Sequence, residues 1–125
     1  MKKVSGSCLC GKVTFTATDP RQVVACHCGQ CRKQSGHFWA ASWSANVSIG
    51  GAEHLGWYDA SDKARRGFCK NCGSFLFWDA HEEDGLSFAA GALDDAADIK
   101  LVQHIFVADK GTYYDPDPGV PTREH

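Results

Sequence analysis

The sequence predicts a mainly β, single domain built from antiparallel sheets. Apolar residues recur mostly with a period of two, glycines separate these runs at turn-like intervals, and helical periodicity is scarce. The chain has 125 residues, a length that suits one domain. A domain of this size buries roughly two-thirds of its unfolded surface, so a closed metal site would add useful stability.

Several runs carry the strand pattern. In 12–18 apolar residues alternate with threonine, as in a half-buried strand. The run 74–78 is apolar on both faces, which predicts a central, buried strand. The other predicted strands are 22–27, 38–43, 54–58, 86–90 and 101–107. We also expect a short helix over 29–34, a turn over 94–98, and a domain over 1–114 followed by a loose, proline-rich tail over 115–125.

The cysteines are the most informative residues. The sequence contains 7, and they fall into three clusters. The outer two clusters are Cys8, Cys10, Cys69 and Cys72; the middle cluster is Cys26, Cys28 and Cys31. A closed structural zinc takes four protein ligands, whereas a working zinc takes three and keeps one position open. The odd count fits poorly with a closed disulfide set, so metal ligation is the better use of these thiols.

The outer cysteines have the spacing of zinc ligands. Cys69-x-x-Cys72 is followed by Gly73, and Cys8-x-Cys10 is followed by another glycine. Two sulfurs at such spacing can face one ion across a tight turn, so each pair supplies half of a tetrahedron. Buried free cysteines that pack as small hydrophobes are the alternative. Together the pairs predict one structural zinc that ties the N-terminal strand to the middle of the chain.

The middle cluster offers three thiols on one short loop. His27 lies inside it, but its ring is expected to turn away because both neighbouring residues direct their sulfurs at the metal. A second closed site completed by a distant histidine is one alternative. A thioredoxin-like redox pair at Cys28 and Cys31 is another, but it needs a strand–helix context that this chain lacks. The distant histidines are His37, His54, His81 and His104.

Charge predicts what an open middle site would bind. Three thiolates on Zn²⁺ leave a net charge near −1, so such a site activates water weakly and suits another thiol, held as thiolate. Arg32, Lys33, Arg65 and Arg66 flank the clusters. Nearby cations favour a carboxylate-bearing thiol such as glutathione, although a solvated basic face is an equal alternative.

Composition excludes several other classes. The formal net charge is −2, which argues against a nucleic-acid partner because such modules need a basic face. No stretch approaches the apolar length of a membrane span. Two lysines near the N-terminus are followed by no apolar run, so we expect no signal peptide and a cytoplasmic protein with reduced thiols. The sequence does not indicate an oligomeric state.

These motifs resemble a known family. Three segments carry the resemblance: Gly6-Ser7-Cys8-Leu9-Cys10-Gly11-Lys12-Val13, Cys26-His27-Cys28-x-x-Cys31-Arg32-Lys33-x-x-Gly36 and Arg66-x-Phe68-Cys69-x-x-Cys72-Gly73-Ser74. They are similar to the glutathione-dependent formaldehyde-activating (GFA, or CENP-V/GFA) domain. The resemblance runs from Val4 to about Tyr114 and is to the short members of the family.

The resemblance implies both a fold and a chemistry. The fold would be Mss4-like, with antiparallel sheets braced by a structural zinc on Cys8, Cys10, Cys69 and Cys72. A second, labile zinc on Cys26, Cys28 and Cys31 would be linked to activity. The family reaction joins formaldehyde and glutathione to give S-hydroxymethylglutathione, which is a carbon–sulfur lyase reaction in reverse. We therefore predict a zinc-dependent carbon–sulfur lyase; the alternative is a non-enzymatic, zinc-braced binding module.

Overall fold

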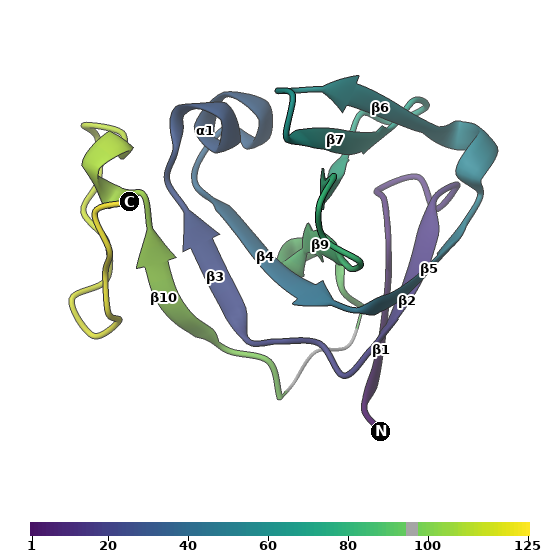
Figure 1. The fold of residues 1–125 in the computed structure, drawn as a ribbon, viewed down its shortest axis with the longest axis horizontal. Coiled ribbons are helices and arrows are strands. Elements are labelled where there is room, and N and C mark those ends of the chain that lie inside the picture. Colours follow the sequence, from purple (N-terminus) through teal and green to yellow (C-terminus); the bar gives the residue numbers. More distant parts are fainter. Residues whose placement is uncertain (95–97) are drawn as a thin grey trace.

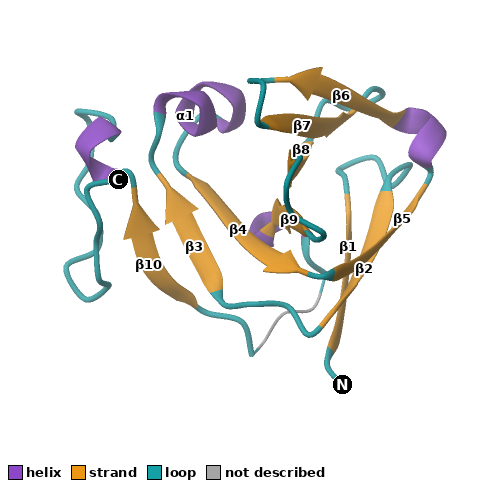
Figure 2. Ribbon diagram, in the orientation of Figure 1, coloured by secondary structure: helices purple, strands orange, loops and turns teal. Residues whose placement is uncertain are grey.

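The computed structural model describes residues 1–94 and 98–125 and contains two β-sheets (Figures 1 and 2). A three-stranded sheet has the order β1-β2-β5, and a seven-stranded sheet has the order β10-β3-β4-β9-β8-β7-β6. Every pair of neighbouring strands is antiparallel except β10 and β3, which are parallel. The strands are β1 (Lys3–Ser7), β2 (Thr14–Thr18), β3 (Val23–Cys26), β4 (Trp39–Ser44), β5 (Asn46–Gly50), β6 (Leu55–Asp59), β7 (Ala64–Cys69), β8 (Phe75–Ala80), β9 (Leu86–Ala89) and β10 (Leu101–Ile105).

This architecture confirms the mainly β, antiparallel prediction. Each strand predicted from sequence has a counterpart, but β1, β5 and β7 were not anticipated. In β1 a glycine occupies one of the buried positions, so the sequence does not show the alternation of apolar and polar residues that marks a strand. Only glycine fits there, because a Cβ on Gly6 would lie 2.7 Å from the Phe15 ring and 2.5 Å from the carbonyl oxygen of Ala92. In β7 two arginines and a glycine interrupt the apolar pattern.

Helical structure is short. Helix α1 (Gly29–Ser35) matches the predicted helix. Cys28 caps its N-terminus by accepting a hydrogen bond from the Cys31 amide, and Gly36 ends it in the left-handed conformation with φ of 85°. The described residues also form the 3₁₀ turns η1 (Ala52–His54), η2 (Ala90–Ala92) and η3 (Val107–Asp109). The turn expected over 94–98 lies largely outside the described residues.

The core fills the space between the two sheets. The Phe15 ring of β2 lies 5.3 Å from those of Phe77 and Phe88, measured between ring centroids. Leu76 and Phe77 are consecutive in β8 and both are fully buried, which confirms the prediction of a central strand buried on both faces. Cys8 and Cys69 border this core. A smaller apolar cluster, centred on Trp39, packs beside the middle cysteines.

The C-terminal segment contacts the large sheet. We expected a loose tail, but the His104 amide donates to the Pro121 carbonyl at 2.9 Å and the Arg123 amide donates to the His104 carbonyl at 2.8 Å. The tail therefore covers the outer edge of β10, whose unpaired backbone groups are a template for another strand. Among the described residues, no helix is both long enough and apolar enough to span a membrane.

Candidate metal centres

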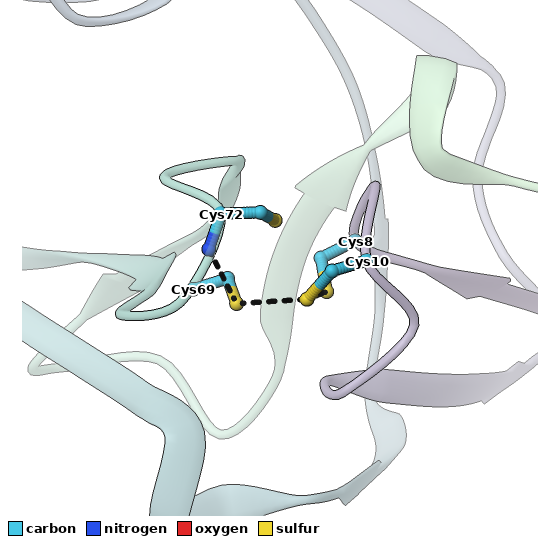
Figure 3. Close-up of side chains that lie close together, drawn as sticks. All are labelled: Cys8, Cys10, Cys69 and Cys72. Atoms are coloured by element: carbon cyan, nitrogen blue, oxygen red, sulfur yellow. Dashed lines mark hydrogen bonds between the residues drawn. The ribbon is translucent and has the colours of Figure 1, made fainter.

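The four outer cysteines meet although they come from distant parts of the chain (Figure 3). Cys8 and Cys10 lie on the loop after β1, whereas Cys69 ends β7 and Cys72 lies in the turn before β8. Their four sulfurs all lie within 4.8 Å of one another; Cys10 Sγ is 3.6 Å from Cys8 Sγ and 3.7 Å from Cys69 Sγ. A tetrahedral zinc with Zn–S bonds of about 2.3 Å needs sulfurs about 3.8 Å apart. The donor set therefore fits zinc.

Backbone amides support these sulfurs. The Val13 amide donates to Cys8 Sγ at 3.3 Å, and the Cys72 amide donates to Cys69 Sγ at 3.4 Å. The second loop turns at Gly73, whose φ of 83° lies in the left-handed region that favours glycine. Such amide bonds stabilise thiolates and orient them toward a metal.

Ser74 links the two outer loops. Its hydroxyl accepts a hydrogen bond from the Leu9 amide at 3.1 Å and lies 3.2 Å from Cys72 Sγ. This hydroxyl is the main reason why the pKa of Cys72 is lowered to about 5. This shift favours the thiolate of Cys72, the form that binds metal.

The middle cysteines form a separate cluster. Cys26 ends β3, Cys28 caps helix α1 and Cys31 lies in its first turn, so one strand–helix junction directs all three sulfurs to one place. The sulfurs lie within 4.8 Å of one another, and the Cys31 amide donates to Cys28 Sγ at 3.4 Å. The pKa of Cys28 is lowered, mainly by its hydrogen bond with Cys26 and next by that with Cys31. The pKa of Cys26 is raised, mainly by its hydrogen bond with Cys28.

The middle cluster offers three sulfurs that could hold a metal. No histidine nitrogen in the described part of the chain lies close enough to join the three sulfurs. The described residues therefore do not form the alternative, a closed site completed by a histidine. His54 instead lies 3.6 Å from the Glu53 carboxylate, and His37 contacts Tyr113. His81 is exposed in the turn after β8. These donors fit a three-thiolate zinc with one open position.

His27 points away from the cysteines, as predicted. Its Nε2 lies 2.8 Å from His104 Nδ1, and its Nδ1 lies 2.5 Å from the Tyr114 hydroxyl. The ring is fully buried, and burial together with the neighbouring His104 lowers the pKa of His27 to about 4. Neutral His27 therefore joins the cysteine loop to β10 and the C-terminal segment. This arrangement was not foreseen, because Tyr114 is far away in sequence.

Arg66 is the basic residue in contact with the middle cysteines. Both of its terminal nitrogens lie 3.6 Å from Cys31 Sγ, and the side chain is 4 % exposed. Its guanidinium also lies 5.5 Å from the centre of the Phe75 ring. The Arg66 guanidinium would offset the −1 charge of a zinc held by three thiolates. The centre would then be close to neutral and could accept an anionic ligand.

The other basic residues have different surroundings. Arg65 binds the Asp79 carboxylate at 2.8 Å and stacks on Trp57. Arg32 donates to the carbonyl oxygen of Asp109 at 3.0 Å. Lys33 is exposed and faces a groove beside α1. Sequence position alone could not separate these roles.

Two aromatic residues near the middle cysteines were also not singled out from sequence. Trp39 of β4 stacks on Phe75 of β8 with 4.3 Å between ring centroids. Both pack in the cluster that includes Cys26, Cys28 and Cys31. Their apolar surface limits the access of water to one side of the sulfurs. Both residues lie in apolar runs of the sequence, but many core residues do so, and this feature does not identify a residue near the site.

Comparison with known proteins places the chain in a family. The model of the family described as "Glutathione-dependent formaldehyde-activating enzyme" matches residues 3–109. A relative in Schizosaccharomyces pombe, named an uncharacterized lyase, is 36% identical over 80 residues, which cover 62% of this chain and 58% of that protein. A Halomonas elongata relative, provisionally named a glutathione-dependent formaldehyde-activating enzyme, is 32% identical over 88 residues, covering 59% of this chain and 54% of the relative.

A solved structure of a Rhodobacter sphaeroides protein supports the fold. It aligns with a TM-score of 0.61 at 19% identity, over 94% of this chain and 98% of that one. The chain spans a little over half the length of the two curated relatives. Because the family model covers most of the sequence, this chain belongs to the glutathione-dependent formaldehyde-activating enzyme family.

Proposed function

We propose that this protein is a zinc-dependent carbon–sulfur lyase that acts on a thiol adduct of the S-hydroxymethylglutathione type. The observation that carries the proposal is the set of three sulfurs from Cys26, Cys28 and Cys31. Residues 1–94 and 98–125 provide no fourth ligand, and a buried arginine lies against one of the sulfurs. The names of the two curated relatives and of the family support an enzymatic role.

The two cysteine clusters have different roles in this proposal. The zinc of Cys8, Cys10, Cys69 and Cys72 is structural, because four ligands leave no position for a substrate. A zinc on Cys26, Cys28 and Cys31 supplies an open position and favours the thiolate form of a thiol ligand. These centres need reduced thiols, so we also propose a reducing compartment such as the cytoplasm.

The reaction is balanced without an oxidant or reductant. In the cleavage direction the carbon–sulfur bond breaks and its electron pair stays on sulfur. The hydroxyl group of the adduct loses its proton as the carbon–oxygen double bond forms. A proton is returned to the thiolate when it leaves, so the products are an aldehyde and a thiol. In the synthetic direction the thiolate adds to the aldehyde carbon and the oxygen takes up a proton.

The protein's own residues favour charge at the substrate sulfur. The Arg66 guanidinium supplies a fixed positive charge beside Cys31, in a buried setting where electrostatic interactions are stronger than in water. Trp39 and Phe75 keep part of this surface apolar. A fixed positive charge at this position favours the anionic form of a bound sulfur over its protonated form.

Metal content and a cobalt titration test the proposal. We expect two metal ions per chain, and we expect glutathione to change the thiolate-to-cobalt absorption of the protein loaded with Co²⁺. S-methylglutathione, which has no free thiol, is the control and should leave the absorption unchanged. NMR with formaldehyde and glutathione should show that the protein accelerates their exchange with the adduct. One metal per chain, or an absorption that glutathione does not alter, would favour the binding-module alternative.

A further inference from the structure

The segment 109–114 lies beside the strand–helix junction that carries the middle cysteines (Figure 1). It contacts this junction at three places, before, within and after helix α1, and each contact joins residues at least 76 positions apart in the sequence. The contacts are the Tyr114 hydroxyl with His27 Nδ1 at 2.5 Å, the Asp109 carbonyl oxygen with Arg32 Nε at 3.0 Å, and the Tyr113 hydroxyl with His37 Nδ1 at 2.5 Å.

This segment is itself an ordered turn. The Lys110 ammonium donates to the carbonyl oxygen of Tyr114 at 2.8 Å and to that of Gly111 at 3.2 Å, which closes the turn. Gly111 is buried, and a Cβ there would overlap the rings of Tyr113 and Tyr114. Only glycine therefore lets both rings pack against the turn, and the two hydroxyls are held in place at the junction.

His27 transmits the contact with Tyr114 to the cysteines on either side of it. Its ring is fully buried, and its backbone amide donates to the carbonyl oxygen of Ile105 at 3.0 Å. Its Nε2 lies 2.8 Å from His104 Nδ1, while its Nδ1 contacts the tyrosine. Three hydrogen bonds therefore hold this residue, and the two cysteines that flank it cannot shift without straining them.

The contacts of segment 109–114 reach one cysteine cluster and not the other. Among the described residues, no hydrogen bond or ion pair joins this segment to the outer cysteines or to the loops that carry them. The family model ends at residue 109, so both tyrosines lie beyond the part that it matches. An effect of this segment on metal binding should therefore be confined to the middle cysteines.

Ordering a ligand loop in advance raises its affinity for a metal. Three thiolates on a short loop repel one another and lose conformational freedom when they converge on one ion. A loop whose backbone is already held by the surrounding structure loses less freedom on binding. Outer contacts of this kind contribute roughly 10–100-fold to metal affinity in other proteins.

We propose that segment 109–114 is a clamp that positions Cys26 and Cys28 for metal binding, with His27 as the positioning residue through which it acts. This inference rests on the part of the proposed function that gives the middle cysteines a metal, and it is independent of the substrate. Because coupling between two sites is reciprocal, a metal on these cysteines also stabilises the clamp. The C-terminal segment then responds to whether the middle centre is loaded.

The first experiment measures the metal affinity of the middle cysteines alone. Protein that carries zinc on the outer cysteines is titrated with Co²⁺ against a chelator, and the thiolate-to-cobalt absorption is followed. The double variant Tyr113→Phe/Tyr114→Phe keeps both rings and loses both hydroxyls. We expect its cobalt affinity to be about tenfold below that of the parent, while an excess of metal still fills the site.

Tyr58→Phe is the matched control for this experiment. Tyr58 is an exposed tyrosine of β6, and its hydroxyl forms no hydrogen bond within residues 1–94 and 98–125. Its replacement should leave the cobalt affinity unchanged. Parental affinity in the double variant, or an equal loss in the control, would overturn the proposal. A double variant that unfolds more easily but binds cobalt like the parent would show that the segment has only a structural role.

The second experiment tests the reciprocal effect by hydrogen exchange. In the parent, Co²⁺ on the middle cysteines should slow amide exchange in segment 109–114 about tenfold, the factor by which the clamp raises the affinity. This slowing should be lost in the double variant. The peptide over 3–18 is the control, because its outer cysteines carry zinc in both states. Equal exchange in segment 109–114 with and without cobalt would contradict the coupling.

This proposal and the proposed function fail in different ways. If glutathione leaves the cobalt absorption unchanged while the double variant binds cobalt more weakly, the clamp stands and the thiol chemistry is wrong. If glutathione changes the absorption and the double variant binds cobalt like the parent, the thiol chemistry stands and the clamp is wrong. If the middle cysteines of the parent bind no cobalt, both proposals are wrong.

Discussion

The two cysteine clusters differ in how far apart along the chain their members lie. Cys10 and Cys69 of the outer cluster are 59 residues apart; Cys10 follows β1 of the small sheet, and Cys69 ends β7 of the large sheet. The middle cysteines all come from one strand–helix junction. A cross-link that closes a long loop removes more entropy from the unfolded chain, about 4 kcal/mol for a loop of this length by the chain-entropy model for disulfides. The outer centre should therefore stabilise the fold, whereas the middle one can serve chemistry.

The largest effect is expected for Cys69→Ser. Loss of this ligand breaks the link between β7 and the loop after β1, where Cys69 is fully buried. Because the binding energy of a structural zinc is folding energy, we expect a loss of about 5 kcal/mol or more, comparable with the stability of a small domain. Chemical denaturation followed by circular dichroism measures this loss. A variant that melts like the parent would contradict the structural role of the outer centre.

Cys28→Ser should separate the two clusters. We expect this variant to fold and to keep the outer metal, because its cysteine belongs to the local cluster. Replacing a direct ligand should lower turnover on the order of 100-fold or more, since loss of a supporting outer contact alone costs 10–100-fold. Serine still caps α1, so the helix should remain. Metal analysis and the adduct assay test both parts, and a variant that retains full turnover would refute an active middle centre.

Arg66→Met should weaken the middle centre without affecting the outer one. Methionine keeps much of the apolar volume but removes the charge that contacts Cys31 Sγ. We expect affinity of the middle cysteines for metal to fall about tenfold, as for other supporting contacts. Competition with a chelator, read separately for the two metals of each chain, measures this change. Arg65→Met is the matched control, because the Arg65 side chain pairs with Asp79 and stacks on Trp57 instead of contacting the middle cysteines. Equal losses in both variants would show that Arg66 has no specific role.

The smallest effect is expected for Tyr114→Phe. The substitution removes the hydroxyl that lies 2.5 Å from His27 Nδ1 and leaves the ring in place. Loss of one hydrogen bond to a buried group should lower the free energy of unfolding by about 1 kcal/mol. Thermal denaturation measures this change, and metal content should stay at the parental value. Unchanged stability would mean that the contact does not hold the C-terminal segment.

The sequence predicted elements whose pattern is local. The alternation in 12–18 and the apolar run at 74–78 identified β2 and β8, because each residue's environment repeats with the pleat. The same reasoning missed β7, where Arg66 occupies a buried position in a strand. A buried arginine contradicts the usual pattern, and its reason lies in a cysteine on another element. The tail was expected to be loose because its composition is polar, but its partner is the edge of β10.

For the candidate site, spacing identified two pairs and one triplet of cysteines, because ligands on one turn must follow local geometry, and ligand count combined the pairs into a set of four. It also indicated that His27 would turn away from them. Tertiary structure decided which of the four flanking basic residues contacts the sulfurs. It also decided that no histidine in the part of the chain the structure describes completes the middle cluster. It also placed Gln34, Lys33 and Arg66 around one groove. Local spacing determines which atoms can share an ion, whereas only chain folding determines which distant side chain lies beside it.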